Sequence, residues 1–231
     1  MNIDVIMLTD SDTNNMIAKR TIATLRDSEK EHNFNIILMD SAKNGINPEL
    51  INISNHYSNI KEPFNYNRFI NLAAYYLSDA DWIVISNNDI SYEKGWFSEI
   101  LKVHEERPDI TSFSPKDPML FMRYFPHHFV GTDSTYFESY QVTEALQGWC
   151  IVIKKESLKK ILPLDELFDM YYQDNDFAEM LKLNHIKHAL CRHSIACHLS
   201  TFYISHPIPP DKSEKLKSDE YKFRSKWNIW N

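Results

Sequence analysis

Short apolar segments that alternate with helical spacing constrain the fold of this chain most strongly. The predicted strands, in which apolar and β-branched residues predominate, comprise residues 3–8, 35–39 and 82–85. The predicted helices between them comprise residues 12–30, with Asp12 or Thr13 as the cap, and 63–77. Such an alternation is typical of βαβ units, so we expect an α/β fold with a mainly parallel sheet.

The rest of the chain continues the α/β pattern less regularly. Further predicted strands comprise residues 51–53, 110–113, 148–153, 186–191 and 195–198. Further predicted helices comprise residues 96–106, 155–161, 169–183 and 213–230. The segment 115–145 is irregular and rich in aromatic residues and histidine, so it suits a lid or an acceptor-binding surface as well as plain packing over the sheet. A length of 231 residues suits one domain.

The composition excludes several classes of function. The sequence has only four glycines, and no two of them lie close together, so neither a GxGxxG motif nor a P-loop is present. This excludes the common dinucleotide-dependent oxidoreductases and the P-loop kinases and NTPases. A net charge of −7, from 25 basic and 32 acidic residues, argues against general nucleic-acid binding, because that affinity rests on neutralised phosphates.

The cysteines and the hydropathy of the sequence predict the cellular compartment of the protein. The three cysteines form no CxxC pair, and an odd number argues against a disulfide framework. No segment approaches the roughly 18 consecutive apolar residues of a membrane span. The first residues lack a basic region followed by an apolar one, so no secretion signal is predicted. We therefore expect a reduced, cytoplasmic protein without a membrane span.

Two of the predicted strands end at a carboxylate. Asp40 directly follows residues 35–39, and Asp89 ends the polar run that follows residues 82–85. Ligands of open α/β sheets bind beyond the carboxyl ends of the strands, where an aspartate can hold a divalent cation. Asn and Asp are also common turn residues, so an ordinary strand exit gives the same pattern. The correspondence between the two strands favours a nucleotide crevice with a metal nearby.

A second pair of carboxylates, Asp174 and Asp176, stands near the start of the predicted helix 169–183. The unpaired N–H groups and the dipole of a helix stabilise carboxylates there, so capping is one interpretation. A general base is the other, because a carboxylate near the reacting centre can accept the proton of an attacking hydroxyl. The residues themselves leave both interpretations open.

Potential nitrogen and sulfur ligands gather late in the chain, at His185, His188, Cys191, His193, Cys197 and His198. Zinc prefers such ligands, but the spacing fits no common zinc pattern, and side chains on strands alternate between the two faces. A single histidine that completes an oxygen-rich site for Mn²⁺ or Mg²⁺ fits better. His198, at the end of a predicted strand, is the candidate.

Taken in order, the segments of the second half resemble inverting glycosyltransferase family 2, which has the GT-A fold, and its rhamnosyltransferase-like subgroup. That family shows a glycine-led strand and short helix, an F-D-E-x-F-like phrase, an E-D-x-D-L-like phrase and a strand that ends in histidine. The corresponding segments here are GWCIVIKKESLKKI, PLDELF, YYQDNDF and ACHLS.

Upstream segments extend the resemblance over nearly the whole chain. IDVIMLTD resembles the family's first strand, and IILMDSA carries Asp40 where the family has the aspartate that reads the nucleotide base. FNYNRFINLA resembles the helix whose start faces the nucleotide, and ISNNDI resembles the metal-binding D-x-D region. The tail FRSKW resembles the closing helix of the family.

Two residues depart from the family pattern. Asn87 occupies the first D-x-D position, so Asp89 is the only carboxylate of that motif. Gln173 precedes Asp174 where the family usually has glutamate. The expected metal site therefore relies on His198 and on the diphosphate of the donor.

The resemblance implies a single GT-A domain over residues 1–231. Its sheet would be Rossmann-like and mostly parallel, flanked by helices, with a small antiparallel portion on the acceptor side. Residues 1–114 would form the nucleotide-sugar-binding half and residues 115–210 the acceptor and catalytic half. Residues 211–231 would form a C-terminal helix.

The resemblance also implies a hexosyl- or pentosyltransferase that moves a sugar from a nucleotide-diphosphate donor, UDP by default, to a hydroxyl acceptor with inversion. Asp89 and His198 would hold Mn²⁺ or Mg²⁺, which assists departure of the nucleotide. Asp174 would be the general base, with Asp176 as the alternative. The implied donor-binding residues are Thr9, Asp40, Asn67, Asn71, Asn88, Gly148 and Trp149. The last two would flank the sugar, because glycine permits close approach and an indole offers an apolar face.

The acceptor and two other functions stay open. A surface glycan or a lipid-linked saccharide is the default acceptor of the family, and a protein or a modified DNA base are the others. A nucleotidyltransferase is a rival enzyme, although it usually needs a glycine-rich loop after the first strand and LTDSDTNN has none. A catalytically inactive nucleotide-sugar-binding module is the rival from a different class, which Asn87 and Gln173 favour.

Overall fold

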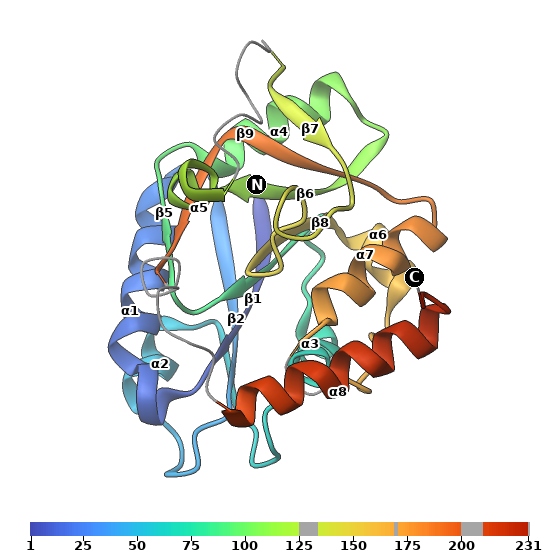
Figure 1. Ribbon diagram of the computed structural model, residues 1–231. Coiled ribbons are helices and arrows are strands. Elements are labelled where there is room, and N and C mark those ends of the chain that lie inside the picture. Colours follow the sequence, from blue (N-terminus) through green and yellow to red (C-terminus); the bar gives the residue numbers. More distant parts are fainter. Residues whose placement is uncertain (125–133, 169–170, 200–209, 231) are drawn as a thin grey trace.

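The computed structural model describes residues 1–124, 134–168, 171–199 and 210–230. In this part of the chain a sheet of nine strands runs through the centre, with helices on both faces (Figure 1). The strands are β1 (Asn2–Thr9), β2 (Asn33–Asp40), β3 (His56–Asn59), β4 (Trp82–Asn87), β5 (Ile90–Tyr92), β6 (Ile110–Lys116), β7 (Tyr136–Glu138), β8 (Cys150–Lys154) and β9 (Lys187–His198). The helices are α1 (Ser11–Ser28), α2 (Pro48–Ile53), α3 (Tyr66–Ala73), the 3₁₀ turn η1 (Ala74–Tyr76), α4 (Trp96–Glu106), α5 (Pro118–Tyr124), α6 (Lys155–Ile161), α7 (Gln173–Leu183) and α8 (Pro210–Trp227).

The sheet is parallel in one half and mixed in the other. Its strand order is β3-β2-β1-β4-β8-β6-β9-β5, and β7 pairs with β9 beside this path. The first four strands are mutually parallel, and β6 is parallel to β9. β8 is antiparallel to both β4 and β6, and β5 and β7 are antiparallel to β9. The predicted fold class, a mostly parallel α/β sheet with a small antiparallel portion, is confirmed.

Apolar side chains cover both faces of the sheet. Along β1, Val5 and Met7 point to the face covered by α1 and α4, while Ile6 and Leu8 point to the face covered by α3, α6 and α7. Successive side chains of a strand alternate between faces, so a strand that is buried on both sides is apolar along most of its length. This explains the nearly continuous apolar runs of β1, β2 and β4, in which the buried Asp4 is an exception that accepts hydrogen bonds from Asn35 and Ser78. The polar ends of these strands are left to form the site.

The predicted strand 51–53 is wrong, because these residues belong to α2. Asn47 caps this helix, since its side chain accepts hydrogen bonds from the backbone N–H groups of the first turn, and Pro48 is well suited to the first helical position. The third parallel strand is β3 instead, which pairs with β2. Two isoleucines, Ile51 and Ile53, are therefore too few for apolar character alone to distinguish a strand from a helix.

Three other predictions need correction. The expected strands 186–191 and 195–198 are one strand, β9, whose register against β6 shifts between Pro115 and Lys116. Helix α7 begins at Gln173 rather than at 169, because Tyr172 has a left-handed φ of 64°. The predicted cap of α1, Asp12 or Thr13, is wrong, because Asp10 caps this helix and its Oδ1 accepts from the N–H of Asp12 at 3.1 Å.

Candidate functional site

Two adjoining cavities open where β1 and β4 end. The first, here called the β1 cavity, has a volume of about 350 Å³. Its lining includes Thr9, Ser41 and Asn88. The second, here called the β8 cavity, has a volume of about 440 Å³. Its lining includes Gly148, Trp149, Gln173, Asp174 and His198. Both cavities share Phe64, Tyr66 and Asn87, so they form one cleft.

Thr9 and Asn88 lie side by side in the β1 cavity. Thr9 ends β1, and Asn88 directly follows the neighbouring strand β4. The Asn88 Nδ2 donates a hydrogen bond to Thr9 Oγ1 at 2.8 Å, and the Asn88 carbonyl accepts from Thr21 Oγ1 at 2.6 Å. Two of the predicted donor-binding residues are therefore held in fixed positions on the cavity wall.

Asp40 ends β2, but its carboxylate accepts hydrogen bonds from other groups of the protein. The side chain is fully buried. Its oxygens accept hydrogen bonds from the N–H of Ser11 at 2.9 Å, the hydroxyl of Ser11 at 2.5 Å and the hydroxyl of Tyr57 at 2.6 Å. Asp40 thereby connects β2, the start of α1 and β3. Its predicted contact with a nucleotide base stays untested, because these bonds occupy the carboxylate in this structure.

Asn67 and Asn71 also turn toward the protein. The Asn67 Nδ2 donates to the carbonyl oxygen of Asp165 at 2.6 Å. The Asn71 side chain donates to the carbonyl of Leu164 at 2.9 Å and accepts from its N–H at 2.7 Å. The two amides thus attach α3 to the segment 164–168, which precedes the catalytic candidates along the chain. Their direct contact with a donor also stays a prediction.

Asp89 and His198 meet at the cleft, as the resemblance implies. Asp89 stands between β4 and β5, and His198 ends β9, which pairs with β5 through Ile90. This pairing brings His198 Nε2 to 3.1 Å from Asp89 Oδ1. The imidazole stacks on Trp149, with ring centroids 5.4 Å apart and an interplanar angle of 14°. Asn87 Nδ2 lies 3.5 Å from the same imidazole nitrogen.

The ligand atoms of this pair suit a hard divalent cation. A carboxylate oxygen and an imidazole nitrogen at this separation can coordinate one ion, and Mn²⁺ accepts both ligand types. Asp89 and His198 have side chains 22% and 17% exposed, so an ion can reach them. Mg²⁺ and Mn²⁺ sites commonly combine one or two protein ligands with phosphate oxygens and waters. The residues present therefore fit a metal that binds together with a phosphorylated ligand.

Asp174 lies in the first turn of α7 and faces the β8 cavity. Its Oδ1 accepts from the backbone N–H of Asn175 at 2.9 Å. Burial raises the pKa of the Asp174 carboxyl above the ordinary value for aspartate. A higher pKa makes a carboxylate a stronger proton acceptor, as a general base requires. The position and the raised pKa both suit Asp174 to proton transfer at the cavity.

Gly148 is in contact with Asp174. A Cβ at Gly148 would lie 2.7 Å from the Cβ and 2.8 Å from the Oδ2 of Asp174, well inside van der Waals contact. On the other side, the Tyr66 hydroxyl donates to the Gly148 carbonyl at 3.0 Å and fixes the backbone there. The absent side chain thus makes room for the carboxylate, and the expected close approach of a sugar to Gly148 stays a prediction.

Asp176 faces away from the cavity and fastens α8 to α7. Its side chain is 2% exposed, and its Oδ1 accepts from Lys226 Nζ at 2.7 Å and from Trp227 Nε1 at 2.8 Å. Lys226 also pairs with Asp165 at 2.8 Å. The red helix α8 accordingly runs beside α7 in Figure 1. This geometry gives no support to Asp176 as the alternative general base.

Replacing Lys226 by methionine is expected to lower the free energy of unfolding by about 1–3 kcal/mol, because a buried carboxylate would lose a charged partner. Urea denaturation followed by circular dichroism measures the loss. Lys30→Met is the control, since Lys30 pairs with Asp27 at the surface and both side chains are over three-quarters exposed. We expect no measurable change in that control, and an equal loss in the two variants would contradict the role of Lys226.

In the described segment 171–199, the histidines and cysteines do not bring three potential metal ligands together. His188 is fully buried, and its Nδ1 lies 2.8 Å from the hydroxyl of Ser112. Burial lowers the pKa of His188 to about 4 and raises the pKa of the Cys191 thiol. Over the described ranges, the one group that brings three potential metal ligands within 4.8 Å of one another is Glu29, Glu31 and His32.

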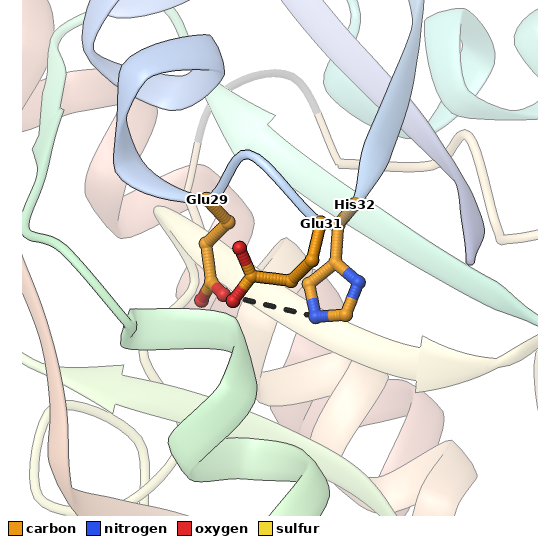
Figure 2. Close-up of side chains that lie close together, drawn as sticks. All are labelled: Glu29, Glu31 and His32. Atoms are coloured by element: carbon orange, nitrogen blue, oxygen red, sulfur yellow. Dashed lines mark ion pairs between the residues drawn. The ribbon is translucent and has the colours of Figure 1, made fainter.

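That group lies at the amino end of β2, away from the cleft (Figure 2). Glu29 is 3% exposed, and its Oε1 accepts from the backbone N–H groups of Phe97 at 2.6 Å and Ser98 at 2.8 Å. These groups open α4, whose own cap residue, Gly95, has no side chain to offer. Capping of α4 therefore explains the position of Glu29 without a metal.

Two residues that line the cleft, Tyr66 and Gln147, were not predicted from the sequence. Tyr66 lines both cavities, and burial raises the pKa of its hydroxyl. Gln147 holds Trp149 in place, because its Oε1 accepts from the indole Nε1 at 3.0 Å. The segments FNYNRFINLA and QGWC contain these residues, but neighbours distant in sequence decide which side chains face the cleft.

Part of the irregular segment 115–145 can be compared with its prediction. It contributes α5 and β7, and Leu120 and Thr143 line the β8 cavity. Phe125, His127, His128 and Phe129 lie outside the described residues. A role of this segment as a lid or an acceptor-binding surface stays a prediction.

Comparison with known proteins identifies the fold. No protein-family model matches the sequence, and no curated protein sequence matches it either. The structure is similar to that of a mannosyltransferase from Pyrobaculum calidifontis in complex with GDP-mannose and Mn²⁺, with a TM-score of 0.63 and 10% sequence identity. The similarity covers 99% of this chain and 76% of that one, and it confirms the expected GT-A-like fold. Within the described ranges, no helix has the length and apolar character that a membrane crossing needs.

Proposed function

We propose that this protein is an inverting glycosyltransferase, which moves a sugar from a nucleotide-diphosphate donor to a hydroxyl acceptor. The observation that carries the proposal is the composition of one cleft at the carboxyl edge of a GT-A-like sheet. Its wall includes Asp174, a carboxylate with a raised pKa, and His198, which is paired with Asp89. A general base can take the proton of the acceptor, and a bound cation can neutralise the leaving diphosphate, so the two together suit this transfer.

The donor would lie along the cleft, with its nucleotide in the β1 cavity and its sugar in the β8 cavity. Thr9 and Asn88 would contact the nucleotide, and Trp149 would flank the sugar. UDP is the default donor nucleotide of the family that the sequence resembles. GDP is the other candidate, because the similar mannosyltransferase is in complex with GDP-mannose.

Asp89 and His198 would hold Mn²⁺ or Mg²⁺ against the diphosphate. When bound, the ion supplies Lewis-acid assistance, because it neutralises negative charge on the leaving nucleotide. The polar atoms of Asn87 lie beside the same imidazole nitrogen and can bind a water or a phosphate oxygen there. The chain's own contribution is to fix the two ligands through the pairing of β5 with β9.

Asp174 would act as the general base. The acceptor oxygen attacks the anomeric carbon while its proton passes to the Asp174 carboxylate, and the bond from that carbon to the diphosphate oxygen breaks on the opposite face. Attack and departure on opposite faces invert the configuration. In this proposal Asp40, Asn67 and Asn71 act indirectly, because they hold the strand ends and the segment 164–168 in place.

Gly148→Ala is expected to lower the rate of transfer by about 10²-fold, because the new methyl group displaces the Asp174 carboxylate and misplaced catalytic groups lose such factors. Nucleotide binding in the β1 cavity should change little. Steady-state kinetics measures the rate of transfer, and calorimetric titration with the nucleoside diphosphate measures nucleotide binding. An unchanged rate would show that Asp174 is either free to move or not the base.

Incubation of the purified protein with a panel of UDP- and GDP-sugars tests the function. We expect release of the nucleoside diphosphate that depends on Mn²⁺ or Mg²⁺ and increases when a saccharide acceptor is added. The configuration of the product, read by NMR coupling constants, tests inversion. A panel that neither binds nor reacts, with or without metal, rules out the proposal.

The same assay separates the rival functions. Binding of a nucleotide sugar without turnover would indicate an inactive binding module. Release of pyrophosphate from a nucleoside triphosphate and a sugar phosphate would indicate a nucleotidyltransferase. For the acceptor we propose a glycan or a lipid-linked saccharide, and mass spectrometry of products from an acceptor library identifies which.

A further inference from the structure

The main chain at His198 is held from both neighbouring strands. This residue ends β9, which lies between β6 and β5 in the sheet. On the β5 side, the N–H of the next residue, Leu199, donates to the carbonyl of Asp89 at 2.9 Å. On the β6 side, the N–H of His198 donates to Oδ2 of Asp117 at 3.1 Å. His198 is therefore attached both to Asp89 and to a further carboxylate.

Asp117 holds β9 where the pairing of backbones stops. The pairing of β6 with β9 ends at Lys116 and Ile195, and Asp117 directly follows β6. An N–H group beyond the end of such a pairing needs another acceptor. The side chain of Asp117 supplies this acceptor to His198, so it extends the contact between the two strands to the site.

The same carboxylate caps α5. Its Oδ1 accepts from the backbone N–H groups of Met119 at 2.9 Å and Leu120 at 3.3 Å. Leu120 lines the β8 cavity and belongs to a small apolar cluster with Leu190 of β9. The two oxygens of Asp117 thus connect one wall of the cavity with the main chain of His198.

Capping alone does not explain a buried charge at this position. The side chain of Asp117 is fully buried, and removing a carboxylate from water is costly. A serine caps a helix about as well as an aspartate does and carries no charge. A serine has a single side-chain oxygen, however, whereas Asp117 uses one oxygen for α5 and the other for His198.

We infer that Asp117 is a positioning residue, which holds the main chain of His198 so that the imidazole faces Asp89. This inference rests on the proposed function, in which Asp89 and His198 bind the metal. The imidazole is stacked on Trp149, and its Nε2 lies 3.1 Å from Asp89 Oδ1. A displaced His198 would lose both contacts, and groups that orient a metal ligand from outside contribute about 10- to 100-fold to metal affinity.

Asp117→Ser and Asp117→Ala separate positioning from capping. Serine keeps an oxygen for α5 and loses the one for His198, whereas alanine loses both. We expect both variants to bind Mn²⁺ about tenfold more weakly than the wild type in the presence of UDP or GDP, as measured by electron paramagnetic resonance of free Mn²⁺. The melting temperature should fall less in the serine variant, because it keeps the cap. Wild-type affinity for Mn²⁺ in the serine variant would show that the cap alone matters, which overturns the inference.

NMR of the His198 imidazole protons tests the position without metal or nucleotide. The indole of Trp149 is stacked on this ring at an interplanar angle of 14°, so its ring current shifts these resonances. At alkaline pH, where histidine is neutral, Asp117→Ser should move them toward the values of an unstacked histidine. The resonances of the exposed His185 are the control and should stay unchanged.

The outcomes distinguish the inference from the proposed function. If the wild type does not bind Mn²⁺ even with a nucleoside diphosphate, the proposed metal site fails and the inference fails with it. If the wild type binds Mn²⁺ and the serine variant binds it equally well, the inference alone is overturned. A weaker affinity with unmoved His198 resonances assigns the effect to the lost charge rather than to position, and it also overturns the inference.

Discussion

Asp174→Asn should lower the turnover of glycosyl transfer by about 10²–10⁴-fold while it leaves donor binding nearly unchanged. An amide has the shape of the carboxylate but cannot take the proton of the acceptor hydroxyl. The donor contacts proposed for Thr9, Asn88 and Trp149 do not involve this group. Steady-state kinetics and calorimetric titration of the same preparation measure the two effects.

The same substitution is expected to stabilise the protein at neutral pH. Because burial raises the pKa of Asp174 in the folded state, the carboxyl favours folding when protonated, and this contribution is lost as the pH rises through the raised pKa. An asparagine avoids that loss. The melting temperature of the variant should therefore exceed that of the wild type at pH 7, and the difference should disappear at acidic pH.

The pH dependence of the wild-type enzyme follows from the same shift. Transfer should fall as the pH drops through the pKa of Asp174, because only the carboxylate accepts a proton. The acidic limb of the rate profile should therefore lie above the pH at which an ordinary aspartate titrates.

Asp176→Asn is the matched control for these experiments. It should lower stability, because Lys226 Nζ and Trp227 Nε1 would lose a charged acceptor. Its effect on turnover should be smaller than that of Asp174→Asn. A crippled Asp176→Asn beside an active Asp174→Asn would show that the base has been assigned to the wrong carboxylate.

Strands β1, β2 and β4 could be predicted because both of their faces are buried. Their apolar runs are therefore long and unambiguous, as in β1 and β4. The run 51–53 was misread because it is short, and the capping by Asn47 before Pro48 decided its structure. Apolar character distinguishes strands from helices poorly at such lengths.

The resemblance, rather than a predicted strand pairing, led to the expectation that Asp89 and His198 lie together, because no strand was predicted at residues 90–92. The pairing of β5 with β9 brings the backbones of the two residues close, and their side chains then lie 3.1 Å apart. Asp40 illustrates the limit. Its position at the end of β2 was predicted, but Ser11 and Tyr57 bind its carboxylate, and no local pattern reveals such partners. Likewise, the sequence pattern does not distinguish Asp174 from Asp176 as the candidate base, because the difference lies in the contact of Asp176 with α8.

Asp89→Ala should abolish metal-dependent transfer and lower the affinity for Mn²⁺ in the presence of UDP or GDP by about 100-fold or more, since even indirect contacts to a metal ligand are worth 10- to 100-fold. The effect is large because Asn87 cannot replace the lost charge, so His198 would remain as the one strong protein ligand of the site proposed here. Electron paramagnetic resonance of free Mn²⁺ measures the affinity independently of catalysis.

Asn87→Asp provides the opposite test. It adds a carboxylate beside the imidazole nitrogen that lies 3.5 Å from the amide, which should tighten Mn²⁺ binding and lower the metal concentration needed for half-maximal activity. If Asp89→Ala keeps full metal-dependent activity, the pair is not the metal site. If Asp89→Ala loses Mn²⁺ and Asn87→Asp gains it, the ion binds beside the end of β4, because both changed residues stand there.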